Sequence, residues 1–324
     1  MSKWRTSTIT FASLFAAGSL WVCSKYAFSA YRSLTPEELG LDEFESLHQV
    51  GKLKLNRYLR IHPTNTDICY IVVHGFGGQM LSLAPVINLL ADFGSVFAVD
   101  HVGHGKSQTS TDPLDYSTEA IVESIASTFK SSCPQFKTVV VIGHSLGCAH
   151  SVRLSNILQE SGVNVKGIVL VSPKSTEEDL PMLKKMVQRV SPIAIDFIRF
   201  VESFAGAYST SVNRIVHKND LTLRHRSCRW NRATPSSVIR LTALGIHLPE
   251  PKDYESIRAP LLMLYGIHDT LTKYDPNVTN IEKWAKNSQI SIHELDSSHL
   301  PMWEDNDNFN RHLLAFLKDI KAVV

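Results

Sequence analysis

One short segment constrains this chain more than any other: Gly143–Gly147, which reads G-H-S-L-G. It directly follows the apolar run Thr138–Ile142, which is typical of a buried strand, and it precedes a stretch with helical spacing. A strand that runs straight into G-x-S-x-G must turn sharply, and the turn holds the serine in strained backbone geometry. The flanking glycines leave room for that turn. We therefore expect Ser145 to be an exposed nucleophile at the start of a helix.

The rest of the chain alternates between strand and helix patterns, after a polar linker and a pair of strands within residues 33–60. Such alternation predicts an α/β fold, with a mostly parallel central sheet and helices on both faces. We expect strands at Ile68–Val73, Val96–Asp100, Thr138–Ile142, Gly167–Val171, Leu261–Gly266 and Ile290–Leu295. We expect helices at Leu81–Leu90, Thr118–Phe129 (with Thr118 as N-cap), Cys148–Gln159, Thr279–Asn287 and Asn308–Ala322.

The alternation stops between Pro173 and Arg258 and then resumes. This stretch has helical patches, at Met182–Val190 and Ile195–Phe204, and an arginine-rich part. Because it interrupts the series of strands, we interpret it as a helical cap inserted at about 173–258 into one domain that spans 37–324. No repeat or low-complexity run is visible.

A serine hydroxyl becomes a strong nucleophile only when a base takes its proton and a carboxylate orients that base. The chain has 14 histidines, so position must choose among them. His299 follows the last predicted strand, and Asp269 follows the strand before it. The order Ser145, Asp269, His299 suits this strand–helix architecture, and all three lie at carboxyl ends of strands, where open parallel sheets bind ligands. We predict that these three residues are catalytic.

Acyl transfer to the serine also needs hydrogen-bond donors for the oxyanion, worth about 3–4 kcal/mol each. The backbone N–H of Leu146, directly after the serine, is one candidate. The glycine-rich loop His74–Gly78 follows the first core strand, and the Phe76 N–H is the second candidate. We predict that Phe76 and Leu146 form the oxyanion hole.

Other kinds of site are weakly indicated. His101 and His104 have the spacing of metal ligands, but no third ligand lies nearby in the sequence, so we expect no metal and no cofactor. Asp100 is expected to bond to backbone groups. The five cysteines form no C-x-x-C pair, which favours buried thiols in a reducing compartment. The net charge of +2 gives no general attraction to nucleic acid.

Together these segments resemble the α/β-hydrolase family. His74–Gly77 resembles its H-G-x-G loop, and Asp100–Ser107 resembles its D-x-x-G-x-G-x-S turn. The serine segment resembles its nucleophile elbow, and His299–Asp305 resembles the H-x-P-x-x-E-D segment around its catalytic histidine. The resemblance covers about residues 65–322 and implies the α/β-hydrolase fold. A fainter resemblance, over Leu223–Leu244, is to fungal lipid-droplet hydrolases and related abhydrolase-domain lipases.

We therefore predict a serine esterase or lipase that cleaves carboxylic esters, with lipid acyl esters as the expected substrates. Two alternatives stay open: an acyltransferase that uses an alcohol acceptor, and a non-catalytic binding protein. Some family members transfer acyl groups with an H-x-x-x-x-D motif, but here Glu304 stands at the last position and Asp305 follows it. The departure lowers the case for acyl transfer without removing it.

The cap and the N-terminus both bear on membrane contact. From Leu221 to Pro249 there is no acidic residue, while five arginines (224, 226, 229, 232 and 240) are present. They either face anionic headgroups or form a solvated face that pairs within the fold. Residues 6–24 are uncharged and just long enough to cross a bilayer. We interpret 1–36 as an uncleaved membrane anchor, in the endoplasmic reticulum, at a lipid droplet or in a mitochondrion. A cleaved secretory signal and a mitochondrial presequence are the alternatives.

Overall fold

The computed structural model describes residues 39–65, 67–177 and 180–323. Eight strands form one sheet in the order β1-β2-β4-β3-β5-β6-β7-β8. The first two strands pair antiparallel with each other, β2 pairs antiparallel with β4, and all the other pairs are parallel. The strands are β1 (Glu45–Val50), β2 (Leu53–Arg60), β3 (Ile68–Val73), β4 (Ser95–Val99), β5 (Thr138–His144), β6 (Asn164–Val171), β7 (Leu261–Gly266) and β8 (Ile290–Leu295).

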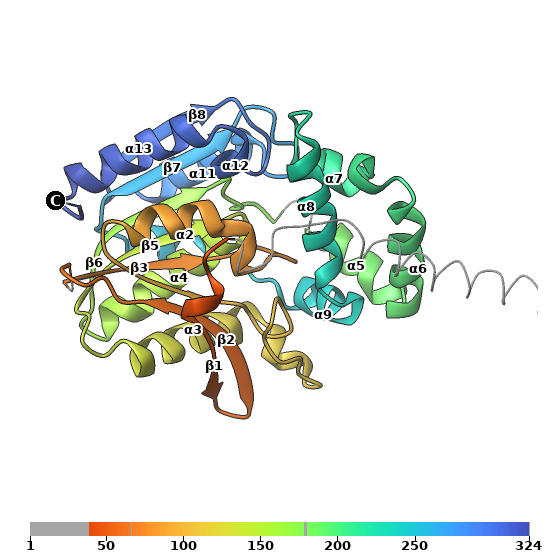
Figure 1. Cartoon of the computed structure of the whole chain (residues 1–324), viewed down its shortest axis with the longest axis horizontal. Helices are drawn as coiled ribbons and strands as arrows, with labels where there is room; N and C mark the ends of the chain where they lie inside the picture. Colours follow the sequence, from red (N-terminus) through yellow and green to blue (C-terminus); the bar gives the residue numbers. More distant parts are fainter. Residues whose placement is uncertain (1–38, 66, 178–179, 324) are drawn as a thin grey trace, which may run out of the picture.

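The central strands are buried on both faces, which explains their nearly continuous apolar sequences. Along β3, alternate side chains enter two different cores: Cys69 and Ile71 contribute to one, and Tyr70 and Val72 to the other. The first core holds residues of α3 (Thr118–Ser132), α4 (Leu146–Glu160), α10 (Pro251–Glu255) and α11 (Tyr274–Trp284). The second core holds residues of α2 (Ala84–Ala91), α12 (Pro301–Glu304) and α13 (Asn306–Asp319). The predicted α/β architecture, with helices on both faces, is confirmed (Figure 1).

Five helices between β6 and β7 stand beyond one end of the strands (Figure 1). They are α5 (Leu180–Arg189), α6 (Pro192–Ser203), α7 (Thr210–Ile215), α8 (Leu221–Ala233) and α9 (Ser236–Gly245). We call these five helices the cap. The next helix, α10, packs against α4 and α11 instead.

Several predicted helix boundaries shift for identifiable reasons. Helix α3 has Ser117 rather than Thr118 as its N-cap, because the Ser117 side chain accepts from the Ala120 N–H. The helix predicted from Thr279 already starts at Tyr274, and it contains a kink at Asp275. The structure also contains short 3-10 helices, which include η2 (Met80–Leu83), η3 (Pro113–Tyr116) and η4 (Gly206–Tyr208).

The predicted N-terminal anchor, 1–36, lies outside the described residues. Across the described ranges, none of the helices combines the length and the apolar character that a bilayer span requires.

Candidate active site

Ser145 lies between β5 and α4 in a conformation that few non-glycine residues adopt, with φ 56° and ψ −122°. Such geometry costs about 1–3 kcal/mol and persists only where the surroundings enforce it. Two hydrogen bonds enforce it here: the Ser145 N–H donates to the Val171 carbonyl (2.8 Å), and the Cys148 N–H donates to the Ser145 carbonyl (3.0 Å). A Cβ on Gly147 would lie 2.4 Å from the Val73 carbonyl oxygen, so only glycine allows helix and strand to approach this closely. The predicted strained turn is present.

Asp269 and His299 are in direct contact. The Nδ1 atom of His299 lies 2.7 Å from Oδ2 of Asp269, and their side chains are only 8% and 1% exposed. The other carboxylate oxygen of Asp269 accepts the N–H groups of Leu271 and Thr272, and the Thr272 hydroxyl donates to Oδ2 at 2.7 Å. Burial works to raise the pKa of Asp269. The His299 imidazole and the Thr272 donors outweigh burial and hold the pKa below its ordinary value. The carboxylate is therefore ionised and oriented toward the imidazole.

A second histidine ties the His299 loop to the serine turn. His144, directly before Ser145, donates from Nε2 to the His299 carbonyl at 2.8 Å, and the two rings lie 4.8 Å apart. Burial lowers the pKa of His144 to about 3, so the ring stays neutral and can keep this donor. The structure thus brings the segments of Ser145 and His299, far apart in the chain, to the same edge of the sheet.

The predicted oxyanion loop packs directly against the serine turn. A Cβ built on Gly75 would lie 2.9 Å from the Ser145 Cβ and 3.3 Å from the Leu146 nitrogen, so this close approach needs glycine. The Gly75 carbonyl accepts from the Gly78 N–H at 3.1 Å, which closes a turn with Phe76 at its second position. Leu146 is the first residue of α4, and the first N–H groups of a helix have no partner within it. The two residues predicted to donate, Phe76 and Leu146, thus directly follow Gly75 and Ser145, whose backbones are in close contact.

His74 positions this loop, a role that the sequence analysis missed. Its Nδ1 donates to the Gly75 carbonyl (2.9 Å), and its Nε2 accepts the His101 N–H (3.0 Å). Burial lowers the pKa of His74 to about 4, so the ring is neutral, as this pattern of one donor and one acceptor requires. The histidine that begins the H-G-x-G segment could have signalled this role.

Asp100 is buried and bonded mainly to backbone, in agreement with the sequence-based expectation. It accepts the N–H groups of Met80 and Lys106 and the Asn56 side-chain amide. Met80 closely follows the oxyanion loop, so Asp100 joins the end of β4 to that loop. His101 and His104 pack beside His74, and among the described residues no group of three or more acidic, histidine or cysteine side chains is arranged to hold a metal ion.

Glu304 is a second residue whose role the sequence analysis missed. Its Oε1 accepts the N–H groups of His217 and Lys218, and its Oε2 accepts the N–H of Ser298, all at 2.7 Å. The buried carboxylate thus joins the loop that carries His299 to the chain that leaves α7. In the H-x-x-x-x-D motif of acyl-transferring family members this position is Asp. Here it is Glu304, and its carboxylate links two segments of the fold.

Comparison with known proteins adds to this geometry. A model of the Alpha/beta hydrolase family matches residues 70–312. The chain belongs to the alpha/beta hydrolase family. An abhydrolase domain-containing protein of Schizosaccharomyces pombe is 25% identical over 290 residues, which cover 83% of this chain and 77% of the relative. A Mycoplasma pneumoniae protein described as a putative esterase/lipase is 26% identical over 270 residues, covering 78% and 90%.

The fold also matches that of solved hydrolases. The structure of a thermophilic esterase from Thermogutta terrifontis superposes with a TM-score of 0.66 at 17% identity, covering 85% of this chain and 98% of the esterase. At this identity the match shows the α/β-hydrolase fold alone, which agrees with the fold predicted from the sequence.

In this alpha/beta hydrolase, a cavity of about 290 Å³ lies between the cap and the oxyanion loop. Its apolar wall includes Phe76, Ile215, Ile239 and Leu271, and its cap side carries Arg199, Arg214 and Arg232. The Ile215 carbonyl accepts the His299 N–H at 3.1 Å, and the Leu271 N–H donates to Asp269, so the cavity adjoins the site.

Of the five cap arginines, Arg224, Arg226 and Arg240 have identified partners within the fold. Arg224 is buried and donates to the carbonyl groups of Lys218, Ala207 and Val216 and to the Asn213 side chain. Arg226 lies over the Trp303 ring, and Arg240 donates to the Val187 carbonyl. Their partners are carbonyl groups, one side-chain amide and one aromatic ring, and the burial of Arg224 shows that this face is not wholly solvated.

Proposed function

We propose that this alpha/beta hydrolase is a serine esterase that cleaves carboxylic esters of apolar acyl chains. The proposal rests on the strained turn at Ser145 together with the hydrogen-bonded Asp269–His299 pair, whose loop is tied to the residue directly before the serine. The esterase/lipase relative supports the same class of reaction. The apolar wall of the adjoining cavity favours an acyl chain, and hence a lipid ester, as substrate.

The proposed reaction has two halves. His299 takes the proton of the Ser145 hydroxyl as its oxygen attacks the ester carbonyl carbon, and the N–H groups of Phe76 and Leu146 stabilise the oxyanion. His299 then gives that proton to the leaving alcohol as the C–O bond breaks, which leaves an acyl-serine. Asp269 stabilises the imidazolium throughout.

Water completes the cycle. His299 takes a proton from water as the water attacks the acyl-serine, and it returns the proton to Ser145 as the acid leaves. The chemistry uses protein groups and water only.

A fluorophosphonate probe tests the nucleophile. The wild-type chain should be labelled, Ser145→Ala should lose labelling, and Ser161→Ala, at the exposed end of α4, should be labelled as wild type. Labelling of Ser145→Ala at the wild-type level would exclude this assignment. Absence of labelling in all three would favour the binding-protein alternative.

A panel of p-nitrophenyl and glycerol esters of increasing chain length tests the substrate class. Longer chains should be cleaved with higher kcat/KM, because they fill the apolar wall of the cavity. Added alcohol that diverts the acyl group from acid to a new ester would instead indicate acyl transfer. Membrane anchoring by residues 1–36 stays a prediction, and a fusion of those residues to a fluorescent protein tests it.

A further inference from the structure

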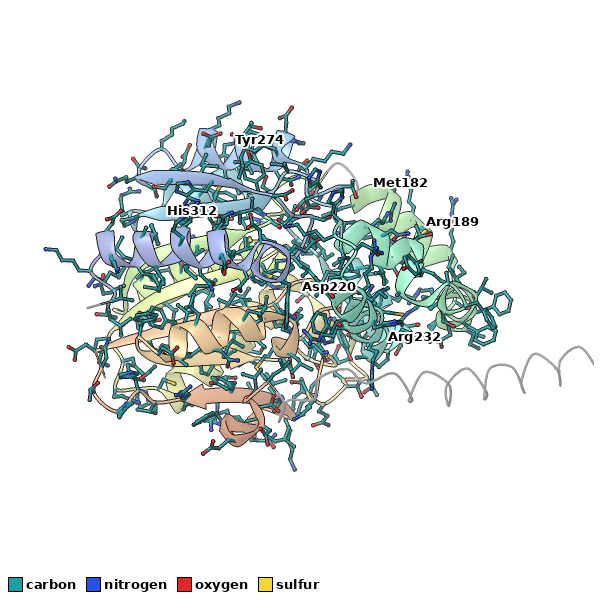
Figure 2. The ribbon with its side chains drawn as sticks, turned by 45° about the horizontal axis from the view of Figure 1, so that its top comes forward. Met182, Arg189, Asp220, Arg232, Tyr274 and His312 are labelled. Carbon is teal, nitrogen blue, oxygen red and sulfur yellow. The ribbon has the colours of Figure 1, made fainter. Side chains whose placement is uncertain are left out.

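One end of the cap exposes a cluster of large apolar side chains, each more than half exposed. Among the described residues, most of the exposed large apolar side chains lie here; Leu221 begins α8, and the others are scattered over elements outside the cap. We call the cluster the apolar cap face; it comprises Met182, Met186, Ile193, Phe197, Ile198, Val201, Phe204 and Tyr208. Figure 2 places Met182 and Arg189 at this end of the molecule.

The spacing shows that the face is a surface of two amphipathic helices. On α6, Ile193, Phe197 and Val201 recur every four residues, so they share one side of the helix. The buried Phe200 lies at the edge of this apolar side, with its ring 5.1 Å from that of Phe204, and Ser203 is buried on the other side of α6. Both α5 and α6 pack against α9, which holds the two helices on the cap. The exposed side is apolar without contributing to the core.

An apolar surface of this extent marks an interaction site. Burying one Phe or Ile side chain contributes about 1.5–3 kcal/mol of favourable free energy. A partner that covers this face would therefore gain a large free energy of binding. The composition is that of interfacial helices, with aromatic and aliphatic side chains on one face and basic residues beside them.

The charges beside the face favour an anionic partner. Helix α5 contains Lys184, Lys185 and Arg189 and no acidic residue, and Arg189 is exposed. The acidic residues of α6 are both engaged within the cap. Asp196 accepts from the Ser236 hydroxyl (2.5 Å), and Glu202 accepts from the Ser211 N–H (2.6 Å).

We propose that the apolar cap face docks onto a lipid surface that carries anionic headgroups, with Phe197 and Phe204 immersed in the acyl region. The basic residues of α5 would then lie at headgroup level. The inner side of α6 supplies Arg199, Glu202 and Ser203 to the cavity that reaches Phe76, so docking brings the cavity next to the lipid. This use of the face rests on the proposed function, whereas the docking itself does not require catalysis.

Vesicle flotation tests the docking, with residues 37–324 assayed beside the full chain so that binding by the predicted anchor at 1–36 is separated from binding by the cap. With vesicles of phosphatidylcholine and phosphatidylserine, Phe197→Glu combined with Phe204→Glu should weaken binding by about tenfold or more. The matched control is Leu47→Glu on the edge strand β1, a position that is 60% exposed; it should bind as wild type. Equal binding by the double variant and by the unsubstituted protein, both starting at residue 37, would overturn the proposal.

Two further arms separate this proposal from others. Ser145→Ala should float as wild type, because docking does not require catalysis. A failed labelling experiment would therefore leave the docking result intact, and failed docking would leave the assignment of Ser145 as nucleophile intact. Vesicles of phosphatidylcholine alone should bind more weakly, since the contribution of Lys185 and Arg189 is lost.

A tryptophan reporter locates the contact. Phe197→Trp should gain fluorescence that lipids with brominated acyl chains quench, while Leu47→Trp should add no such signal. If the introduced indole is already shielded without lipid and vesicles do not change it, another segment or a second copy covers the face and the lipid proposal fails. A dimer of wild type that the Phe197→Glu variant abolishes, measured by sedimentation, would identify the second copy.

Discussion

The ring of His74 stacks on the ring of His101 with centroids 3.7 Å apart, while the His101 N–H donates to His74 Nε2 at 3.0 Å. On its other side His74 donates to the Gly75 carbonyl, so one neutral imidazole connects the end of β4 to the oxyanion loop. In the proposed mechanism this loop aims the Phe76 N–H at a point near Ser145, and errors of about 1 Å in such positioning can cost about 10²-fold in rate.

We therefore expect His74→Phe to lower kcat by about 10²-fold, comparable to the loss of one oxyanion donor. The substitution keeps an aromatic ring of similar shape but removes both hydrogen bonds. Steady-state hydrolysis of a p-nitrophenyl ester measures the change, and KM should move much less than kcat.

His150→Phe is the matched control. His150 is buried beside His101, and neither of its ring nitrogens has a hydrogen-bond partner among the described residues. Replacing it removes no bond to the oxyanion loop, so kcat should stay near the wild-type value. An equal loss of kcat in both variants would show that ring packing, rather than the hydrogen bonds of His74, positions the loop.

The buried histidines also predict acid sensitivity of the fold. Burial lowers the pKa of His74 and His104 to about 4 and that of His150 to about 3, from an ordinary value of 6.5. Between these values the unfolded chain binds protons that the folded chain excludes, so the free energy of unfolding falls as pH falls from 6.5 toward 4. Each histidine contributes at most about 1.4 kcal/mol per pH unit.

Urea unfolding at a series of pH values measures this loss. The His150→Phe variant should lose stability less steeply than wild type over the same window, because it has one excluded proton fewer. Identical slopes for the two proteins would show that His150 is protonated in the folded state.

Asp269→Asn should lower kcat by about 10⁴-fold, because an amide no longer selects the tautomer of His299 or stabilises its charge. The matched control is Asp296→Asn, in the loop directly after β8, where the carboxylate lies exposed beside His268. Rates of ester hydrolysis should fall for the first variant and stay near wild type for the second. A rate for Asp269→Asn within a few-fold of wild type would exclude Asp269 as the group that orients His299.

Much of the fold could be predicted from the sequence because its signals are local. The apolar runs at Ile68–Val73 and Leu261–Gly266 are strands with the predicted bounds, since a strand buried on both faces needs apolar residues throughout. The turn at Ser145 was equally predictable, because glycines at fixed offsets are a steric requirement of the geometry. Helix boundaries shifted where a neighbouring side chain competes, as Ser117 does with Thr118.

The link that Glu304 makes was not predictable because two of its three partners are distant in the chain. Its carboxylate accepts the His217 N–H, 87 residues away, and the H-x-P-x-x-E-D resemblance marks its position without indicating these partners. The arginine-rich helix α8 shows the same problem from the other side, since Arg224 turns inward to bond carbonyl groups that no charge pattern indicates.

The carboxylate of Glu304 provides the last prediction. Its backbone donors, from His217, Lys218 and Ser298, all point at carboxylate oxygens, so Glu304→Gln turns an amide NH₂ toward at least one N–H and leaves that donor unsatisfied. The unfolding free energy should fall by about 1–3 kcal/mol, and kcat by about tenfold, because the Ser298 N–H that fixes the His299 loop loses its acceptor. Urea unfolding and ester hydrolysis measure the two effects, with Glu160→Gln at the exposed end of α4 as control. A variant that loses stability but keeps the wild-type kcat would show that the histidine loop is positioned without Glu304, leaving the His144–His299 hydrogen bond as its main support.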